Sequence, residues 1–295
     1  MKTLTLCPLC GCPHIDNYLT VTDNFLSGEE FTIYRCHDCG FRFTNPRPEA
    51  EQLGQYYKSE NYIAHSNTHK GIIAQLYQMV RTQTLQQKFR MISKSVPRGT
   101  IMDIGCATGE FLSVFKNKGW NATGIEPDSD AANYAKKQFR LDVFGENELN
   151  TLPSNLCDVI TMWHVMEHVD NLAERVDQIQ RLLKPGALAF IAVPNPNSWE
   201  AVHYGKNWAA LDVPRHLSHF SQANMKSLFS ENKNFEWVNT LPMMFDAFYV
   251  SMLSEKYLKS MGGIFRAFFV GLHSNIKASQ SGEYSSLIYI FRKKS

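Results

Sequence analysis

The amino-acid sequence predicts an α/β protein with a Rossmann-like, doubly wound sheet of seven strands, and three observations lead to that prediction. From residue 98 onward, apolar strand-like runs alternate with helical patterns, which is typical of a sheet covered by helices on both faces. The first strand-like run leads through the glycine-rich turn DIGCATGEF, residues 103–111, into a helix. Ahead of this region, four cysteines form two CxxC pairs, which predict a small metal-binding module.

Seven segments of the predicted α/β domain, residues 98–295, have the length and composition of strands. They are residues 99–105, 121–127, 141–145, 157–163, 187–195, 235–241 and 285–294. Between the last two strands lies a stretch rich in Phe, Met and Tyr, about residues 243–282. Its apolar residues recur at helical spacing, so we expect a helical insert before the last strand.

The whole chain has a globular composition, with 295 residues of which 44% are hydrophobic and 20% charged. A chain of this length can form one large core and a small additional module. The net charge of +2 gives no strong attraction to nucleic acid, and no run of roughly 18 uncharged apolar residues predicts a membrane span. The N-terminus MKTLTLCPLC lacks the apolar run of a signal peptide, so we expect a cytoplasmic location with reduced cysteines.

Residues 1–46 are predicted to form a zinc ribbon. Its expected metal ligands are Cys7, Cys10, Cys36 and Cys39. Two CxxC knuckles can place four thiolates tetrahedrally around one Zn²⁺, and the alternative is four unrelated buried cysteines. Cys12, His14 and His37 are spare donors that a shell of four cysteines does not need.

The charge of this N-terminal region argues against a nucleic-acid partner. Residues 1–50 hold four Lys/Arg against six Asp/Glu, a net of −2, so a structural zinc or a lid beside the substrate is favoured. Residues 47–97 then lead into the α/β domain. A chain break at NPRP, a tyrosine-rich stretch and a helical pattern predict a helical linker or lid there.

The charges around the glycine-rich turn indicate which ligand it binds. A pyrophosphate would lie on the helix N-terminus, where Asp103 and Glu110 would repel it, whereas an ammonium or sulfonium would be attracted. Gly105 and Gly109 let the backbone approach a ligand closely. Glu126 follows the second strand, where a carboxylate can accept both hydroxyls of a ribose. S-adenosylmethionine is a positively charged nucleoside that fits this pattern.

Four motifs in sequence order resemble those of the class I S-adenosylmethionine-dependent methyltransferases. They are DIGCATGEF, GIEPD, CDVITMWHVMEHVDN and RLLKPGALAFIAVPN, and the resemblance covers about residues 98–240. Bacterial members with an N-terminal zinc ribbon and a segment like LDVPRHLSHFS are more similar still. The resemblance implies methyl transfer to a small molecule such as a sugar, a quinone precursor or another metabolite. It also implies that the last strand of the sheet is antiparallel.

The pattern and the resemblance together give a set of residues that we expect to bind the methyl donor. They are Asp103, Gly105, Cys106, Ala107, Gly109, Glu126, Pro127, Trp163 and His164. Ala107 stands where the family's commonest loop has a middle glycine, and Trp163 either packs on the methionine part of the donor or fills the core. Contact of Glu146 or Asn147 with the adenine stays open.

Methyl transfer to a hydroxyl or amine also needs a group that takes the acceptor's proton. After the fourth strand, His164, Glu167 and His168 follow the spacing of one helical turn at the carboxyl edge of the sheet, where ligands bind in such folds. After the fifth strand, LDVPRHLSHF brings His216, flanked by Arg215, to the same edge. His216 is the first candidate for the base, and Glu167 or His164 the second. A purely structural role is the alternative for His168.

The sequence therefore predicts a methyltransferase that uses S-adenosylmethionine, carries Zn²⁺ and acts on a small molecule. The alternatives are an RNA methyltransferase with a zinc ribbon and a non-enzymatic protein that binds S-adenosylmethionine. The insert has two interpretations, because residues 241–295 carry seven Lys/Arg against three Asp/Glu beside many apolar residues. It is either a cap for a lipid-linked or acidic acceptor, or a packing surface through which a homodimer forms.

Overall fold

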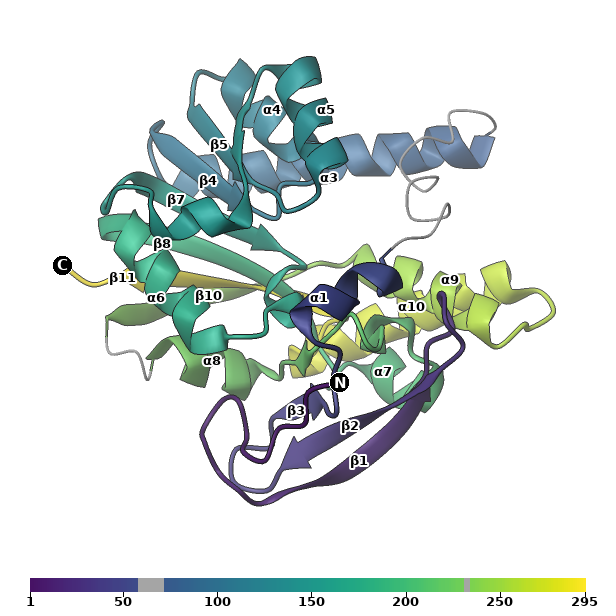
Figure 1. Cartoon of the computed structure of the whole chain (residues 1–295). Coiled ribbons are helices and arrows are strands. Elements are labelled where there is room, and N and C mark those ends of the chain that lie inside the picture. The colour runs from purple at the N-terminus through teal and green to yellow at the C-terminus, as the bar shows by residue number, and fades with distance from the viewer. Residues whose placement is uncertain (58–71, 231–233) are drawn as a thin grey trace.

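The computed structural model describes residues 1–57, 72–230 and 234–295, and these residues contain two β-sheets with helices around the larger one. The larger sheet has seven strands in the order β10-β11-β8-β7-β4-β5-β6. Figure 1 shows the strands β1, β2 and β3 of the smaller sheet as a layer of their own, set apart from β4 and β5 of the larger sheet. The predicted α/β class and the seven-stranded sheet are confirmed.

The seven strands of the larger sheet lie close to their predicted positions. They are β4 (Thr100–Ile104), β5 (Asn121–Ile125), β6 (Asp142–Phe144), β7 (Cys157–Trp163), β8 (Leu183–Pro194), β10 (Phe235–Pro242) and β11 (Ser286–Lys293). Strands β4 to β8 pair in parallel, while β11 pairs antiparallel with both β8 and β10. The antiparallel last strand that the resemblance implied is thus present. Strand β8 begins at Leu183, four residues earlier than predicted, because it includes the Pro-Gly turn that follows the helix.

Helices cover both faces of the sheet because successive strand residues point to opposite sides. Ile101 packs in one core with Leu112 of helix α4, while its neighbour Met102 packs in the other core with Val176 of helix α6. The main helices are α3 (Ile72–Ser95), α4 (Glu110–Asn117), α5 (Ser129–Phe139), α6 (Leu172–Leu182), α7 (Trp199–Tyr204) and α8 (Gln222–Ser230). Shorter helical turns are α1 (Ala50–Leu53), η1 (Gly54–Tyr56), η2 (Glu146–Asn150), η3 (Met166–His168), η4 (Gly205–Asn207) and η5 (Ala209–Leu211).

The N-terminal region forms the smaller sheet, and a strand from the α/β domain completes it. Its strands are β1 (Ile15–Thr22), β2 (Glu30–Cys36), β3 (Arg42–Thr44) and β9 (Ser218–His219), in the order β1-β2-β3-β9. Strand β9 lies within the LDVPRHLSHFS segment and pairs antiparallel with β3. The rings of Phe41 and Phe220 pack 5.3 Å apart beside this junction. The segment with the base candidate His216 is therefore fixed against the N-terminal sheet.

The predicted helical insert consists of α9 (Asp246–Tyr257) and α10 (Gly263–Ser281), two helices that pack on each other (Figure 1). Gly271 permits their close approach, since a Cβ atom there would lie 3.0 Å from the Cα of Phe248. In the part of the chain that the structure describes, no helix is long and apolar enough to cross a membrane. Of the predicted linker or lid, residues 58–71 lie outside the described residues.

Candidate active site

The glycine-rich turn after β4 has the backbone that its sequence requires. Gly105 and Gly109 have φ angles of +80° and +83°, which side chains of other residues rarely tolerate. A Cβ atom at Gly105 would lie 2.4 Å from Cγ2 of Val165, and one at Gly109 would lie 2.8 Å from Cβ of Ala135. Gly105 therefore lets the turn pack against the loop after β7, and Gly109 lets it pack against α5. Strand β4 lies between β5 and β7, so successive strands are added on one side of β4 first and then on the other. Ligands bind at such switch points in open α/β folds.

Glu126 lies directly against this turn. Its Oε2 accepts a hydrogen bond of 2.7 Å from the backbone N–H of Ala107, and its Oε1 accepts one of 2.9 Å from Asp128. Ala107 has a φ of +46°, which explains why glycine is common at this position. The neighbouring Pro127 is exposed. The thiol of Cys106 packs against Gly124 in the core, so only the backbone of Cys106 can meet a ligand in the turn.

Asp103 is buried in β4, paired in register with Gly124 of β5 and Thr161 of β7. The hydroxyl of Thr161 donates a hydrogen bond of 2.5 Å to its carboxylate. Burial raises the pKa of Asp103 to about 8, against the opposing effects of Thr161 and Lys88. A cation beside this carboxylate would lower the pKa again, so Asp103 is suited to binding a positively charged group.

Helix α3 places two basic side chains beside the carboxylates of the turn, and the sequence reasoning missed both. Arg81 Nη2 lies 3.0 Å from Glu110 Oε1, and Lys88 Nζ lies 3.8 Å from the centroid of the Trp163 ring. Burial lowers the pKa of Lys88 to about 8, opposed by the nearby Asp246 and Asp103. The repulsion of a pyrophosphate by Asp103 and Glu110 is therefore weaker than the sequence predicts, because α3 places Arg81 beside Glu110 and Lys88 near Asp103.

His164 is held between two carboxylates. Its Nε2 lies 3.1 Å from Asp246 Oδ2, and its Nδ1 lies 3.3 Å from Glu167 Oε1. Burial lowers the pKa of His164, but Asp246 and Glu167 outweigh that effect and raise it to about 10. His164 is therefore an imidazolium at neutral pH, and of the three predicted base candidates it is the one least able to accept a proton. Nothing in the spacing of the sequence indicated its contact with Asp246 of the insert.

The other base candidates meet where the loop after β7 approaches the segment before β9. Glu167 is fully buried and His216 is 8% exposed. The rings of His168 and His216 lie 4.7 Å apart, nearly perpendicular to each other, and His219 lies beside His216 at 6.5 Å. Sequence spacing thus predicted which segments meet here. The flanking Arg215 does not face this cluster.

Arg215 instead joins the N-terminal sheet to the α/β domain. Its Nη2 lies 2.8 Å from Asp23 Oδ1 and 2.7 Å from Asp212 Oδ1, and its Nη1 donates to the carbonyl of Tyr56 at 3.0 Å. Arg215 and Asp23 are each 2% exposed. Burial lowers the pKa of Arg215, but the two carboxylates outweigh that effect and raise it. The role of Arg215 is therefore structural.

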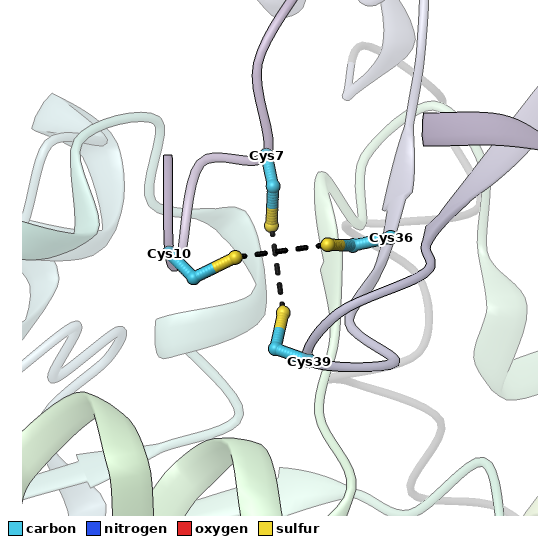
Figure 2. Close-up of side chains that lie close together, drawn as sticks. All are labelled: Cys7, Cys10, Cys36 and Cys39. Carbon is cyan, nitrogen blue, oxygen red and sulfur yellow. Dashed lines mark hydrogen bonds between the residues drawn. The ribbon is translucent and has the colours of Figure 1, made fainter. Parts of the chain in front are cut away.

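The four cysteines of the two CxxC pairs converge on one point, with their sulfur atoms directed toward one another (Figure 2). The Sγ atoms of Cys7 and Cys39 are 3.7 Å apart, and those of Cys10 and Cys36 are 3.6 Å apart. A tetrahedral zinc site with Zn–S bonds of about 2.3 Å places its sulfurs about 3.8 Å apart. Gly11 and Gly40 follow the pairs with φ angles of +73° and +67°, as two tight knuckles require. The geometry of these residues therefore fits a zinc ion.

The strand order, the glycine turn after β4 and the carboxylate after β5 agree with the methyltransferase class that the sequence resembles. The chain belongs to the methyltransferase domain family, since the sequence model of that family matches residues 77–240, more than half of the chain.

Curated relatives carry methyltransferase names. A malonyl-(acyl-carrier protein) O-methyltransferase of Pectobacterium atrosepticum is 23% identical over 122 residues, which cover 41% of this chain and 47% of the relative. A ubiquinone biosynthesis O-methyltransferase of Rickettsia conorii is 27% identical over 116 residues, 38% of this chain and 40% of the relative. The chain thus spans less than half the length of these two relatives.

The fold also recurs in a solved structure whose title names a different reaction. The cyclase SpnF is 15% identical, with a TM-score of 0.53 over 84% of this chain and 98% of that one. At this identity the likeness shows the fold alone. The reaction has to be inferred from the residues of the site.

Proposed function

We propose that this protein is an enzyme that transfers the methyl group of S-adenosylmethionine to a small-molecule acceptor by in-line displacement. The observation that carries the proposal is the position of Glu126 against the turn of Gly105 to Gly109, with buried Asp103 beneath it. Glu126 would accept the ribose hydroxyls, the backbone of the turn would contact the nucleoside, and Asp103 would face the ammonium group. The cation–π contact of Trp163 with Lys88 supports a role for this ring beside a positive charge, and the sulfonium would take the place that Lys88 holds in the free protein.

The transfer forms a bond between the acceptor atom and the methyl carbon while the carbon–sulfur bond breaks, and S-adenosylhomocysteine leaves. Catalysis depends mainly on positioning the acceptor in line with that bond. A hydroxyl or amine acceptor also releases a proton, and we propose His216 as its first recipient, with Glu167 second. The names of the two relatives favour a small acceptor, and the net charge of −2 over residues 1–50 disfavours RNA.

Binding of S-adenosylmethionine should strengthen roughly tenfold between about pH 6.5 and about pH 8, the gain expected for one coupled proton. In the free protein the pKa of Asp103 is about 8, and a bound cation lowers it. The contribution of Asp103 to the binding free energy of S-adenosylmethionine is therefore complete above the pKa of the free protein, and it is lost as the pH falls below that value. Asp103→Asn should bind weakly at both pH values. Isothermal titration calorimetry in buffers of different ionisation enthalpy measures both the affinity and the released proton.

Two controls belong to this titration. Glu126→Gln should weaken donor binding without removing the pH dependence, because Asp103 remains intact. NADH should not compete, since the backbone N–H of Ala107 in the turn already donates to Glu126 and is not available to a pyrophosphate. A protein that ignores S-adenosylmethionine but binds NADH firmly contradicts the proposed function. Affinity that does not change with pH contradicts the role of Asp103 alone.

We further propose that residues 1–46 are a zinc ribbon with Cys7, Cys10, Cys36 and Cys39 as ligands, as in the bacterial subgroup that the sequence resembles. The fit of the sulfur spacing to a tetrahedral zinc site supports this. All seven cysteines are free thiols in the structure, which is compatible with the cytoplasmic location that we propose. Helix α3 would act as a lid over the donor, because Arg81 reaches Glu110 beside the glycine turn and Lys88 reaches Trp163 at the end of β7.

The helical insert is proposed as a homodimer surface, because α10 exposes a row of large apolar side chains. Phe265 is 72% exposed and Phe269 is 65% exposed. We expect the double variant Phe265→Glu/Phe269→Glu to be monomeric under conditions in which the unmodified protein is dimeric, as measured by light scattering. Tyr134→Glu, an exposed aromatic residue on α5, is the matched control and should stay dimeric. A monomeric unmodified protein would contradict the dimer and leave the cap for a lipid-linked acceptor as the alternative.

A further inference from the structure

A second cluster of metal-ligand types lies on the acceptor side of the proposed active site. Glu167, His168 and His216 each offer one ligand atom, and these atoms all lie within 4.8 Å of one another. Glu167 and His168 belong to the turn η3 after β7, and His216 precedes β9. The cluster is made of nitrogen and oxygen donors and shares no residue with the cysteine cluster.

Both histidines are fixed in the orientation of metal ligands. His168 Nδ1 lies 2.9 Å from both the carbonyl oxygen of Arg215 and the hydroxyl oxygen of Tyr57, and His216 Nδ1 lies 2.9 Å from the carbonyl oxygen of Ala210. A carbonyl oxygen only accepts hydrogen bonds, so each Nδ1 carries the hydrogen, and the hydroxyl of Tyr57 accepts as well. The nearest carboxylate to His216 Nε2 outside the cluster, that of Asp212, is 3.9 Å away. Each Nε2 is then left with its lone pair. Metal-binding histidines commonly have this arrangement, in which a backbone carbonyl fixes the tautomer and the direction of the ring.

Glu167 supplies an independent indication of a further cation. Its side chain is 1% exposed, and its Oε1 faces the imidazolium of His164, whose Nδ1 lies 3.3 Å away. Among the residues that the structure describes, Oε2 has no hydrogen-bond partner. A buried carboxylate oxygen without a partner is costly, and native proteins pair such groups with donors, cations or metals. A metal ion held by Glu167, His168 and His216 would provide that partner.

We propose that Glu167, His168 and His216 bind one divalent first-row transition metal ion, such as Zn²⁺, Mn²⁺ or Co²⁺. Two imidazoles and one carboxylate leave coordination positions open, as in catalytic rather than closed structural sites. His168 is partly exposed, so a metal ion could reach the cluster from its side, whereas Glu167 is buried and borders the protein interior.

The open positions would hold an oxygen atom of the acceptor, a step that rests on the proposed methyl transfer. A hydroxyl bound to such a metal releases its proton to solvent more readily, since the cation stabilises the anionic oxygen. That oxygen then attacks the methyl carbon, and the electron pair of the carbon–sulfur bond stays on sulfur, so no oxidant or reductant is needed. In this mechanism His216 is a ligand instead of the general base, and the acceptor is an oxygen compound.

The test is metal binding by the full chain, with no acceptor required. Titration with Co²⁺ should show two equivalents per chain, one with the thiolate-to-cobalt charge-transfer absorption of the cysteine site and one without it. His168→Gln and His216→Gln should each weaken the second equivalent at least about tenfold and leave the thiolate absorption unchanged. His203→Gln, an exposed histidine on α7, is the matched control and should keep both equivalents.

A single equivalent in the unmodified protein would overturn the metal site whether or not the variants fold. The role of the metal in the reaction is tested separately from the proposed function. If methyl transfer is unchanged after the second equivalent is removed, the metal does not hold the acceptor, although the protein is a methyltransferase. If the second metal binds but donor binding is absent, the proposed function fails and the metal site remains.

Discussion

Replacing Asp23 with alanine should lower the free energy of unfolding by about 3–5 kcal/mol. Asp23 is 2% exposed, and its carboxylate pairs with the equally buried guanidinium of Arg215 at 2.8 Å. The same carboxylate accepts hydrogen bonds from the backbone N–H groups of Phe25, Leu26 and Ser27. The substitution therefore removes one partner of a buried ion pair and leaves three backbone donors without their acceptor. Urea denaturation followed by circular dichroism measures the loss.

The pH dependence of stability gives a second readout of the same pair. Burial raises the pKa of Asp23, but Arg215 and Ser27 outweigh it and the net shift is downward. A carboxyl with a lowered folded pKa contributes stability that is complete above its unfolded pKa of about 3.9 and is lost as the pH falls through the folded value. Asp23→Ala should therefore lose less stability in acid than the unmodified protein does.

Asp16→Ala is the matched control for this effect. Asp16 also pairs with a basic side chain, His37, at 2.5 Å, but the two side chains are 73% and 61% exposed. Exposed ion pairs contribute about 0–1 kcal/mol, so this variant should remain near the stability of the unmodified protein. Equal losses in the two variants would contradict the view that burial makes the Asp23 pair important.

The seven strands and the glycine turn could be predicted because local sequence determines them. A half-buried strand alternates its side chains and a tight turn needs residues with positive φ, so Gly105 and Gly109 are visible in the sequence. Strand β9 is different: it has only two residues, Ser218 and His219, and its partner β3 lies far away in the chain. No local pattern indicates such a pairing.

The electrostatics of the donor site show why the prediction there was incomplete. The sequence identifies Asp103 and Glu110 as acidic residues around the turn, but their environment depends on α3. Whether Lys88 reaches Trp163 and Arg81 reaches Glu110 depends on how that helix packs on the domain, which its composition does not reveal. That a side chain is acidic follows from the sequence, whereas its charge at neutral pH depends on its burial and its partners, which follow from tertiary structure.

Removing Cys36, one of the four proposed zinc ligands, should have the other large effect. We expect Cys36→Ser to lose about one zinc ion per chain and to unfold the N-terminal sheet before the rest of the protein, because binding of a structural zinc is coupled to folding. Cys36 ends β2 and is completely buried, so solvent cannot supply a ligand in place of its thiol. Zinc analysis together with limited proteolysis of residues 1–46 measures both changes.

The chain offers a close control for this variant in Cys12. Cys12 is also buried and lies near the cluster, but it is not one of the four cysteines that converge: its Sγ accepts a hydrogen bond of 3.2 Å from the backbone of His14, and its potential ligand neighbours are His14 and Asp38. Cys12→Ser should therefore retain zinc and resist the protease, whereas zinc loss in this variant would assign Cys12 to the metal.

The effect of Cys36→Ser should also extend to the proposed active site. Strand β3 holds β9, and Thr44 of β3 donates a hydrogen bond of 2.7 Å to the carbonyl of His216. If the ribbon supports that site, donor binding should survive in Cys36→Ser while acceptor turnover falls; equal loss of both would show that the zinc stabilises the whole chain instead.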